Sequence, residues 1–349
     1  MKKVLITVLT ACVTLVSFAQ QRPHYTQYVI NPYIINPAIT GIENYTDLKV
    51  GIRDQWVGLN GAPKTTYFTI HSPIGKGDDY ATSATSFEVP GENPRGRAYW
   101  RSYTAAEPHH GVGMSIINDR TGSFNFFSAS ASYAYHLGLS PTTNLSGGFS
   151  AGITKISIDR SKHDFDGTGD PTDPALGSAF SGKLTKIRPN ASVGLWLYSR
   201  DYFIGVAAQQ VIPQTVSFVN DNPSITEKGR FVPHLFLTAG YRFMLNDDVN
   251  AIPSLMVKYI KGSSLREFQP EANLKLQYRD LLWVGGSYRY QDSFAGMLGL
   301  NVSNTFNVSY SYDRSNTTLQ LNDFNRGTHE IVLGFLIGNK YSEKCPRCY

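Results

Sequence analysis

Apolar and polar residues alternate with period two through most of the chain from Thr46 to Gly338. Successive side chains of a β-strand point to opposite faces, so the pattern predicts strands with one apolar and one polar face. In two clear examples, Phe306, Val308, Tyr310 and Tyr312 alternate with Asn307, Ser309, Ser311 and Asp313, and Ala272, Leu274, Leu276 and Tyr278 alternate with Glu271, Asn273, Lys275, Gln277 and Arg279. Both a membrane barrel and a soluble sandwich have such strands.

The length of the segments separates these two folds. Most are roughly the 9–11 residues that a tilted strand needs to cross a bilayer, whereas soluble strands average about five or six. We therefore expect an all-β fold, a transmembrane antiparallel β-barrel of about 14 strands over residues 46–338, with a soluble secreted β protein as the alternative. The expected strands are Thr46–Arg53, Lys64–Ser72, His110–Asn118, Asn125–His136, Thr143–Ile156, Arg188–Tyr198, Tyr202–Val211, Val232–Leu245, Val249–Tyr259, Phe268–Tyr278, Leu281–Gln291, Phe294–Val302, Thr305–Asp313 and Thr328–Ile337.

The connections between these strands alternate in length. One set is short, as at Arg200-Asp201 and Asp280, and the interleaved set includes the long segments Ser157–Ile187 and Arg314–Gly327. Short periplasmic turns and longer external loops are typical of outer-membrane barrels. The exception is Pro73–His109, a long insert on the short-turn side, which is either a partner contact or plug, or an ordinary tolerated loop.

The two faces of the strands differ in chemistry. Aromatic residues near strand ends on the apolar face predict two girdles at the membrane interfaces: Tyr133, Tyr135, Tyr241, Phe243, Tyr259, Tyr278, Tyr288, Tyr290, Tyr310 and Tyr312. The opposite face predicts a polar lumen in which charged residues line a channel or pair with one another: Lys155, Glu271, Lys275, Arg279 and Arg289. An arginine at Leu274 should therefore destabilise the barrel more than one at Asn273.

The first 19 residues resemble an export signal. Lys2 and Lys3 precede an apolar run, Val4–Phe18, and Ser17-Phe18-Ala19 fits a cleavage site near Ala19-Gln20. A retained anchor and a lipoprotein attached through Cys12 are the alternatives. The run is short for a membrane span, and it continues past Cys12, where a lipoprotein normally begins a polar tether. We expect residues 1–19 to be a cleaved signal peptide and the mature chain to lie in the outer membrane.

Charge and cysteine content narrow the class further. The formal net charge of +5 becomes about +3 when Lys2 and Lys3 are removed, which is too mild and too dispersed to suggest nucleic acid as a partner. Tyrosine, phenylalanine and glycine are plentiful, whereas the chain has three cysteines. This composition favours a membrane barrel over a disulfide-stapled secreted domain.

Residues 20–45 form an irregular, tyrosine-rich segment before the first strand. It contains two Asn-Pro steps, which forbid a regular helix or a central strand and predict either a plug in the lumen or a segment against the periplasmic rim. Its candidate partner or plug residues are Tyr25, Gln27, Tyr28, Asn31, Pro32, Asn36, Pro37 and Gly41. We expect this segment to be ordered and to matter more for activity than for membrane insertion.

These residues also carry a family resemblance. The segment closely resembles the Q-Y-x-x-N-P-x-x-x-N-P-A-x-x-G pattern of the PorP/SprF family of the Bacteroidetes. A second element resembles the family's R-x-Q-W-x-G-x-x-G-A-P-x-T pattern and contains Gln55, Trp56, Gly58, Gly61, Ala62 and Pro63. Ile117–Gly122 is similar to its N-D-x-x-G hairpin, and Lys344–Arg347, in the expected periplasmic tail 339–349, to its C-P-R ending.

The resemblance implies a non-enzymatic outer-membrane partner of the type IX secretion and gliding system. Its implied partners are outer-membrane lipid, type IX secretion components and a large secreted surface adhesin that it helps to export or anchor, without a cofactor. One alternative is a passive channel, because fourteen strands with an N-terminal Asn36-Pro37-Ala38 also resemble FadL-type transporters. The other is a barrel enzyme, for which no catalytic constellation is readable.

Two further groups of residues are weak candidates for a functional site. Asp164, Asp166 and Asp170 lie on a glycine-rich turn and are a calcium candidate, but the spacing departs from an EF-hand and no glutamate closes the loop. A solvated acidic loop is the simpler interpretation. Cys345 and Cys348 have redox spacing without a suitable scaffold, so a local disulfide or no special role is expected.

Overall fold

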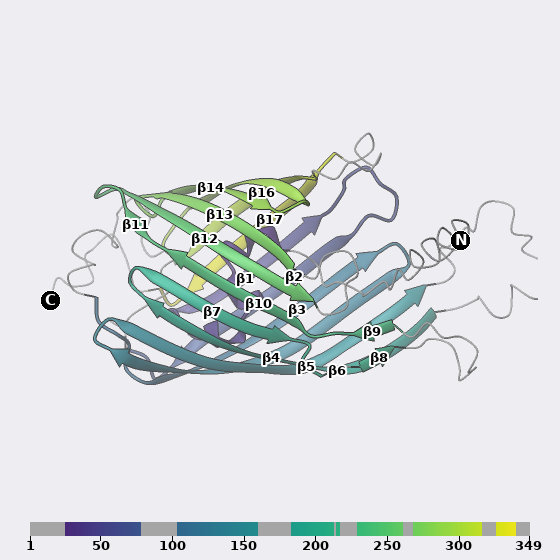
Figure 1. Ribbon diagram of the computed structural model, residues 1–349, viewed down its shortest axis with the longest axis horizontal. Helices are drawn as coiled ribbons and strands as arrows, with labels where there is room; N and C mark the ends of the chain where they lie inside the picture. Colours follow the sequence, from purple (N-terminus) through teal and green to yellow (C-terminus); the bar gives the residue numbers. More distant parts are fainter. Residues whose placement is uncertain are drawn as a thin grey trace, which may run out of the picture.

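The computed structural model describes residues 25–77, 103–159, 183–212, 214–216, 229–260, 268–315 and 326–339. Its strands form an antiparallel barrel (Figure 1). They are β1 Thr46–Asp54, β2 Lys64–Ile74, β3 His109–Thr121, β4 Phe124–Ser140, β5 Thr143–Asp159, β6 Lys183–Ser199, β7 Tyr202–Gln209, β8 Gln214–Val216, β9 Gly229–Phe231, β10 His234–Tyr241, β11 Phe243–Met244, β12 Val249–Ile260, β13 Phe268–Tyr278, β14 Leu282–Arg289, β15 Ser293–Asn301, β16 Phe306–Ser315 and β17 Thr328–Ile337.

Fourteen of these strands close the barrel. Each pairs with its neighbour in the chain, β1 pairs with β17, and the register from His234↔Ile260 to Gly240↔Ser254 joins β10 to β12. The short β11 adds one extra pairing to β12, and β8 and β9 form a separate two-stranded sheet. The prediction of a 14-stranded antiparallel barrel is confirmed.

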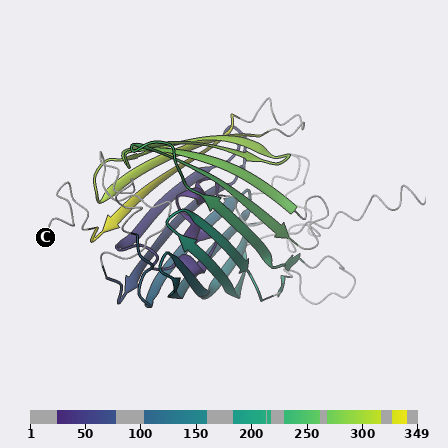
Figure 2. The same ribbon diagram turned by 60° about the vertical axis from the view of Figure 1, so that its left-hand side comes forward.

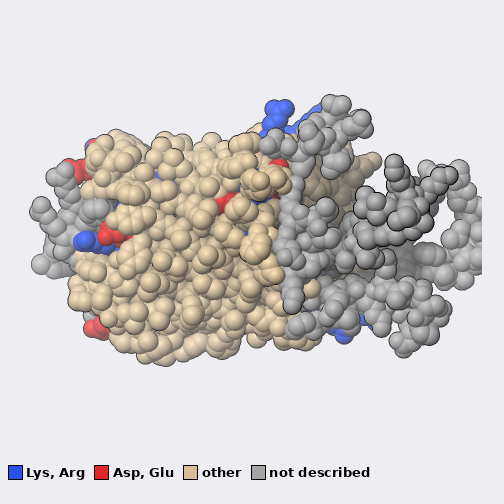
Figure 3. Space-filling view, viewed as in Figure 1, with Lys and Arg blue, Asp and Glu red and all other residues tan. Residues whose placement is uncertain are grey.

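The two faces of the wall differ as predicted. Leu274, Leu298 and Ile331 point outward and are about half exposed, whereas Asn273, Lys275 and Ser311 point inward and are buried. In Figure 3 the middle of the barrel surface is an almost uncharged tan belt, with charged side chains mainly toward its two ends. The predicted aromatic residues also lie outward, and Tyr241, Tyr259 and Tyr278 are close to the ends of their strands. Tyr133 and Tyr310, in contrast, stand near the middle of β4 and β16. An apolar belt with aromatic margins is the surface that a bilayer requires.

The barrel has two unlike ends. We call the end with the short connections at 141–142, 200–201, 279–281 and 302–305 the turn end, and the opposite one the loop end. The wall is taller on one side, because β4, β5 and β6 have 17 residues each, whereas β14 has eight and β15 nine. The extra residues lie mostly toward the loop end, so one side of the wall projects beyond the rest (Figures 1 and 2).

Two residues expected in the lumen lie elsewhere. Lys155 follows Phe149 and Ile153 in the outward row of β5 and is exposed. Arg279 lies in the turn after β13, where its guanidinium pairs with Asp248 at 2.9 Å and is exposed. The prediction was therefore wrong for these two, because one has the parity of the lipid-facing row and the other lies beyond the last paired residue. Glu271, Lys275 and Arg289 do face the lumen.

Candidate functional site

Residues Tyr25–Tyr45, which we call the plug, lie inside the barrel (Figures 1 and 2). They form three short 3-10 helices, η1 Thr26–Val29, η2 Pro32–Ile34 and η3 Pro37–Ile39. Pro32 and Pro37 each occupy the first turn of a helix, where a missing N–H costs nothing, and the Asn36 side chain accepts the amide N–H of Ala38 at 2.9 Å. Each Asn-Pro step therefore begins a new single helical turn, and the segment forms no continuous regular helix.

The plug is hydrogen-bonded to nine of the fourteen barrel strands: β1, β2, β4, β5, β6, β7, β13, β16 and β17. Almost all of its residues are buried, including the polar side chains of Thr26, Gln27, Asn31 and Asn36. Buried polar groups are costly unless they are bonded, so these contacts fix the position of the plug in the lumen. In this structure the segment therefore occupies the lumen and does not lie against the rim.

Toward the loop end, an ion cluster holds the start of the plug. Arg53 of β1 pairs with Asp313 of β16 and Glu330 of β17, both at 2.8 Å, and donates to the Thr26 hydroxyl at 2.6 Å. The Thr26 amide donates to Glu330 at 3.0 Å, and its hydroxyl donates to Asp313. Tyr67 donates to the other oxygen of Glu330 at 2.9 Å. The cluster is buried and therefore depends on all of its members.

The middle of the plug is held by amide side chains and apolar packing. Gln209 of β7 donates to the carbonyl oxygens of Ile34 and Ile35 at 3.0 and 2.9 Å. Asn31 donates to Thr69 at 3.1 Å, and Asn273 donates to the Tyr28 hydroxyl. Asn273 is therefore a plug contact, so an arginine there would also disturb the plug, which the period-two pattern does not reveal.

Toward the turn end, the backbone of the plug lies directly against the wall. His136 contacts the Thr40 carbonyl oxygen at 2.8 Å, and the Gly41 amide donates to His71 at 3.2 Å. The wall has glycines at the points of closest approach. A Cβ at Gly111 would lie 1.9 Å from the Thr40 carbonyl oxygen, and one at Gly148 would lie 2.6 Å from Pro37 and Ala38. These distances exclude any side chain, so the wall is shaped for this segment.

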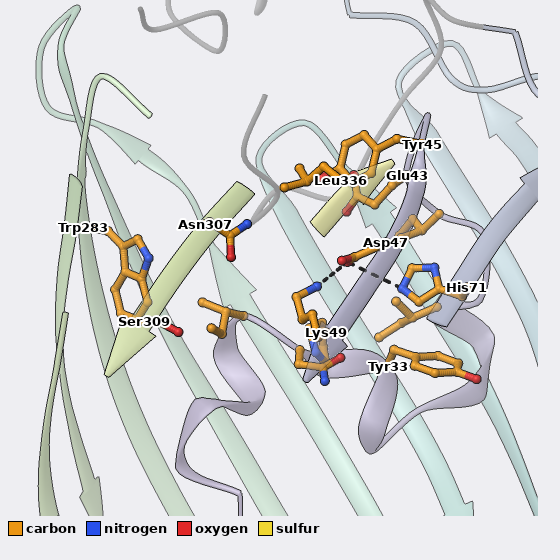
Figure 4. Close-up of a pocket in the computed structure, with 15 residues that line it drawn as sticks. Tyr33, Glu43, Tyr45, Asp47, Lys49, His71, Trp283, Asn307, Ser309 and Leu336 are labelled. Atoms are coloured by element: carbon orange, nitrogen blue, oxygen red, sulfur yellow. Dashed lines mark hydrogen bonds and ion pairs between the residues drawn. The ribbon is translucent and has the colours of Figure 1, made fainter. Parts of the chain in front are cut away.

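A pocket remains between the plug and the wall of β1, β2, β14, β16 and β17 (Figure 4). Asp47 pairs there with Lys49 and lies 3.7 Å from His71. Tyr33 lines the same pocket, and burial raises the pKa of its phenol to about 12, so that the group stays neutral and bonds Ser132 at 2.7 Å. Asp47 and Lys49 thus form an ion pair at the pocket wall, and Glu43 of the plug also lines the pocket.

The described end of the long insert also lies inside the turn end. Tyr103 and Ala106 are buried in one apolar cluster with Ile39 and Ile42 of the plug. The Ala106 amide donates to the Asn144 side chain at 2.9 Å, and the Ala105 amide donates to Pro141. At its described end the insert therefore packs against the plug and helps to fill the turn end of the lumen. Residues 78–102 of the insert lie outside the described residues.

The second family element, Gln55–Pro63, forms a braced loop at the loop end. Val57 exchanges two backbone hydrogen bonds of 2.9 Å with Arg326 and Gly327, and the Gly61 carbonyl oxygen accepts the Gly122 amide at 2.8 Å. Three of its residues have positive φ: Trp56, Gly58 and Gly61. The N-D-x-x-G hairpin contributes Gly122 and Asp119, which accepts the Thr65 hydroxyl at 2.6 Å. The two elements, about 60 residues apart in the chain, thus meet in space.

The predicted residues divide into three groups. Tyr25, Gln27, Tyr28, Asn31, Pro32, Asn36, Pro37 and Gly41 lie together in the plug, and Gln55, Trp56, Gly58, Gly61, Ala62 and Pro63 lie in the braced loop. Asp164, Asp166, Asp170, Cys345 and Cys348 lie outside the described residues. In the part of the chain that the structure describes, no group of three or more histidine, cysteine or acidic side chains is arranged to hold a metal ion. No helix in that part is long and apolar enough to cross a membrane.

The wall partners of the plug were not among the predicted residues. Arg53, Asp313 and Glu330 all belong to inward rows, and charged residues in an inward row are the signal that would have marked them. The pairing of Arg53 with these two acids has no sequence signal, because Arg53 is 260 residues from Asp313 and 277 from Glu330.

Comparison with known families decides the identity. The profile described as "Type IX secretion system membrane protein PorP/SprF" matches residues 17–335. The chain belongs to this family. Together with the barrel fold, membership places this PorP/SprF protein in the outer membrane and in the type IX secretion system. Both the family and the fold are of non-enzymatic types.

Solved structures with a similar fold are remote from this PorP/SprF protein. The outer membrane protein Omp33 of Acinetobacter baumannii has 9% identity over 85% of this chain and 100% of its own, with a TM-score of 0.46. The toluene transporter TbuX of Ralstonia pickettii has 12% identity over 88% and 92%, with a TM-score of 0.46. A FadL homologue of Pseudomonas aeruginosa has 9% identity over 93% and 96%, with a TM-score of 0.45. A search of curated proteins found no match.

Proposed function

We propose that this protein is a non-enzymatic partner of a large secreted adhesin and supports its export through the type IX system or its anchoring at the cell surface. The proposal includes the removal of residues 1–19 as a signal peptide. Family membership supports a role in protein secretion, and the observation that carries the partner role is the plug, which is bonded to nine wall strands. A solute channel needs an open or gated lumen.

The plug has the properties of a fixed structural element. Its start is held by a buried ion cluster and its end lies against wall glycines that admit no side chain. Passage of a solute through the lumen would require most of these bonds to break together. A barrel that keeps its lumen filled still presents both rims to a protein, and external loops are where binding residues usually collect.

Replacement of Asn36-Pro37 by Gly-Ser tests the role of the plug. The change removes the Asn36 contacts to Ala38 and to the Leu195 carbonyl oxygen and also the proline that begins η3. We expect plug docking to weaken by about 2 kcal/mol or more, since a cap and a buried hydrogen bond each contribute about 1 kcal/mol. The amount of barrel in the outer membrane should stay near normal, while the amount of adhesin on intact cells falls.

A matched control is the replacement of Pro141-Thr142 by Gly-Ser in the exposed β4–β5 turn. This control also introduces Gly-Ser in place of a proline-containing dipeptide, but outside the plug. The amount of adhesin displayed on the cell surface should therefore be unchanged. Limited proteolysis of the purified barrels reports whether the plug is docked. If the plug variant is cleaved within residues 25–45 and display is still normal, the plug is only a linker and the partner role does not depend on it.

A further inference from the structure

A row of basic side chains follows the outer surface at the loop end. Arg314 of β16, Arg326, Lys64 of β2, Arg120 of β3 and Lys155 of β5 are exposed there. Lys64 of β2 is the register partner of Arg120 of β3. Arg120 is in turn the partner of Asn125 on β4, and Asn125 is the partner of Ser157 on β5, the strand that carries Lys155. The row therefore spans the arc of wall from β16 through β17 and β1 to β5, which is half of the barrel.

The row stands at the margin of the apolar belt. Arg314 follows Tyr312 outward on β16 and is paired in register with Phe294, which is 53% exposed. Lys64 lies two positions beyond Thr66 and opposite Asp54, just past Ile52, which is 60% exposed. Lys155 follows Ile153 in the same outward row. Cations at this height meet the headgroups of the adjoining leaflet.

Exposed basic side chains differ in their ion pairing between the loop end and the turn end of the barrel. Among the described residues, Lys64 has an ion-pair partner, Asp54 at 3.1 Å, whereas no carboxylate lies within ion-pair distance of Arg120, Lys155, Arg314 or Arg326. At the turn end, Arg200 pairs with Asp201 and Arg279 pairs with Asp248. Among the exposed basic residues that the structure describes, those without an ion-pair partner therefore lie at the loop end.

We propose that this basic row binds the phosphate groups of lipopolysaccharide in the outer leaflet. The ligand must be anionic and located at the level of the headgroups, and its acyl chains must pack on the apolar belt below. Phosphorylated lipid A meets all three conditions, and arginine forms paired hydrogen bonds to phosphate. The short connections at the turn end and the longer ones at the loop end predict that the loop end faces the outside of the cell, which is the leaflet that contains lipopolysaccharide.

A titration of the purified barrel in detergent with lipid A, followed by native mass spectrometry, tests this site. The probes are diphosphorylated lipid A and the same lipid after enzymatic removal of its phosphates. We expect Arg120→Gln combined with Arg314→Gln to weaken binding of the diphosphorylated lipid by about 25-fold, which is roughly fivefold for each arginine. Binding of the dephosphorylated lipid should be weak and equal in both proteins.

The matched control is Arg200→Gln combined with Arg279→Gln, which removes two exposed arginines from the turn end. It should bind diphosphorylated lipid A as the unmodified protein does, and heat-dependent migration in gels checks that both variants are folded. For the unmodified protein, rising salt should weaken binding of the phosphorylated lipid only. Equal binding by all three proteins, or equal binding of both lipids, would overturn the proposal. Displacement of lipid A by millimolar inorganic phosphate would assign the row to free phosphate instead.

Discussion

Replacing Arg53 by methionine should lower the free energy of unfolding by about 3–5 kcal/mol, the cost of removing one partner from a buried ion pair. Asp313 and Glu330 each accept a charged hydrogen bond from Arg53, and the Arg53 side chain is 3% exposed. Without it, two carboxylates remain in the lumen with no cation between them, and the plug loses the contact to Thr26. Urea unfolding of the detergent-folded barrel measures the change.

Neutralising Asp313 and Glu330 in the Arg53→Met variant distinguishes the loss of charge pairing from the loss of side-chain packing. Arg53→Met combined with Asp313→Asn and Glu330→Gln should recover most of the lost stability, because removing a whole buried ionic group is often nearly neutral. Arg279→Met, which breaks an exposed pair in a turn, should have no measurable effect. A loss that is equally large in the triple variant would mean that the Arg53 side chain acts by filling space.

Leu274→Arg should destabilise the barrel by about 2–4 kcal/mol, because it places a charge on the lipid face near the middle of β13. Leu274 is 46% exposed and stands in the outward row between Ala272 and Leu276. Folding of the protein into lipid vesicles at graded urea concentrations measures the difference.

The control for this change lies on the same face of the same strand. Tyr278→Arg places the charge at the turn-end margin, where the cost falls to about 0–1 kcal/mol. Asn273 is unsuitable as a control because its side chain donates to Tyr28 of the plug. Equal costs at Leu274 and Tyr278 would show that β13 does not cross the apolar layer in this register.

The barrel could be predicted because period-two patterning is a local property. All fourteen predicted segments are strands, and the inward and outward rows of β13 and β16 are as predicted, apart from Arg279. The bounds differ most in β6, which begins at Lys183 and not at Arg188. Pro189, which lacks an amide donor, weakens the local strand signal there, yet pairing with β5 continues past it.

The sequence limited the position of the plug to the lumen or the periplasmic rim but could not decide between them. The Asn-Pro steps exclude regular structure, but both a rim and a lumen satisfy that condition. What holds the plug in the lumen is spread over the chain, as in the pairing of Thr26 with Asp313 and of Ala38 with the wall at Gly148. Such contacts join residues more than a hundred positions apart, and no local pattern encodes them. Gly61 and Gly122, about 60 residues apart, also meet without a local pattern that predicts it.

Quantitative mass spectrometry of proteins released from the surface of intact cells, with and without the gene for this protein, tests the partner role most directly. We expect one or a few large adhesins to disappear from the surface, while bulk type IX secretion and uptake of small solutes are unchanged. The contrary result is an unchanged set of surface proteins, together with large, solute-selective conductance of the purified barrel in planar bilayers.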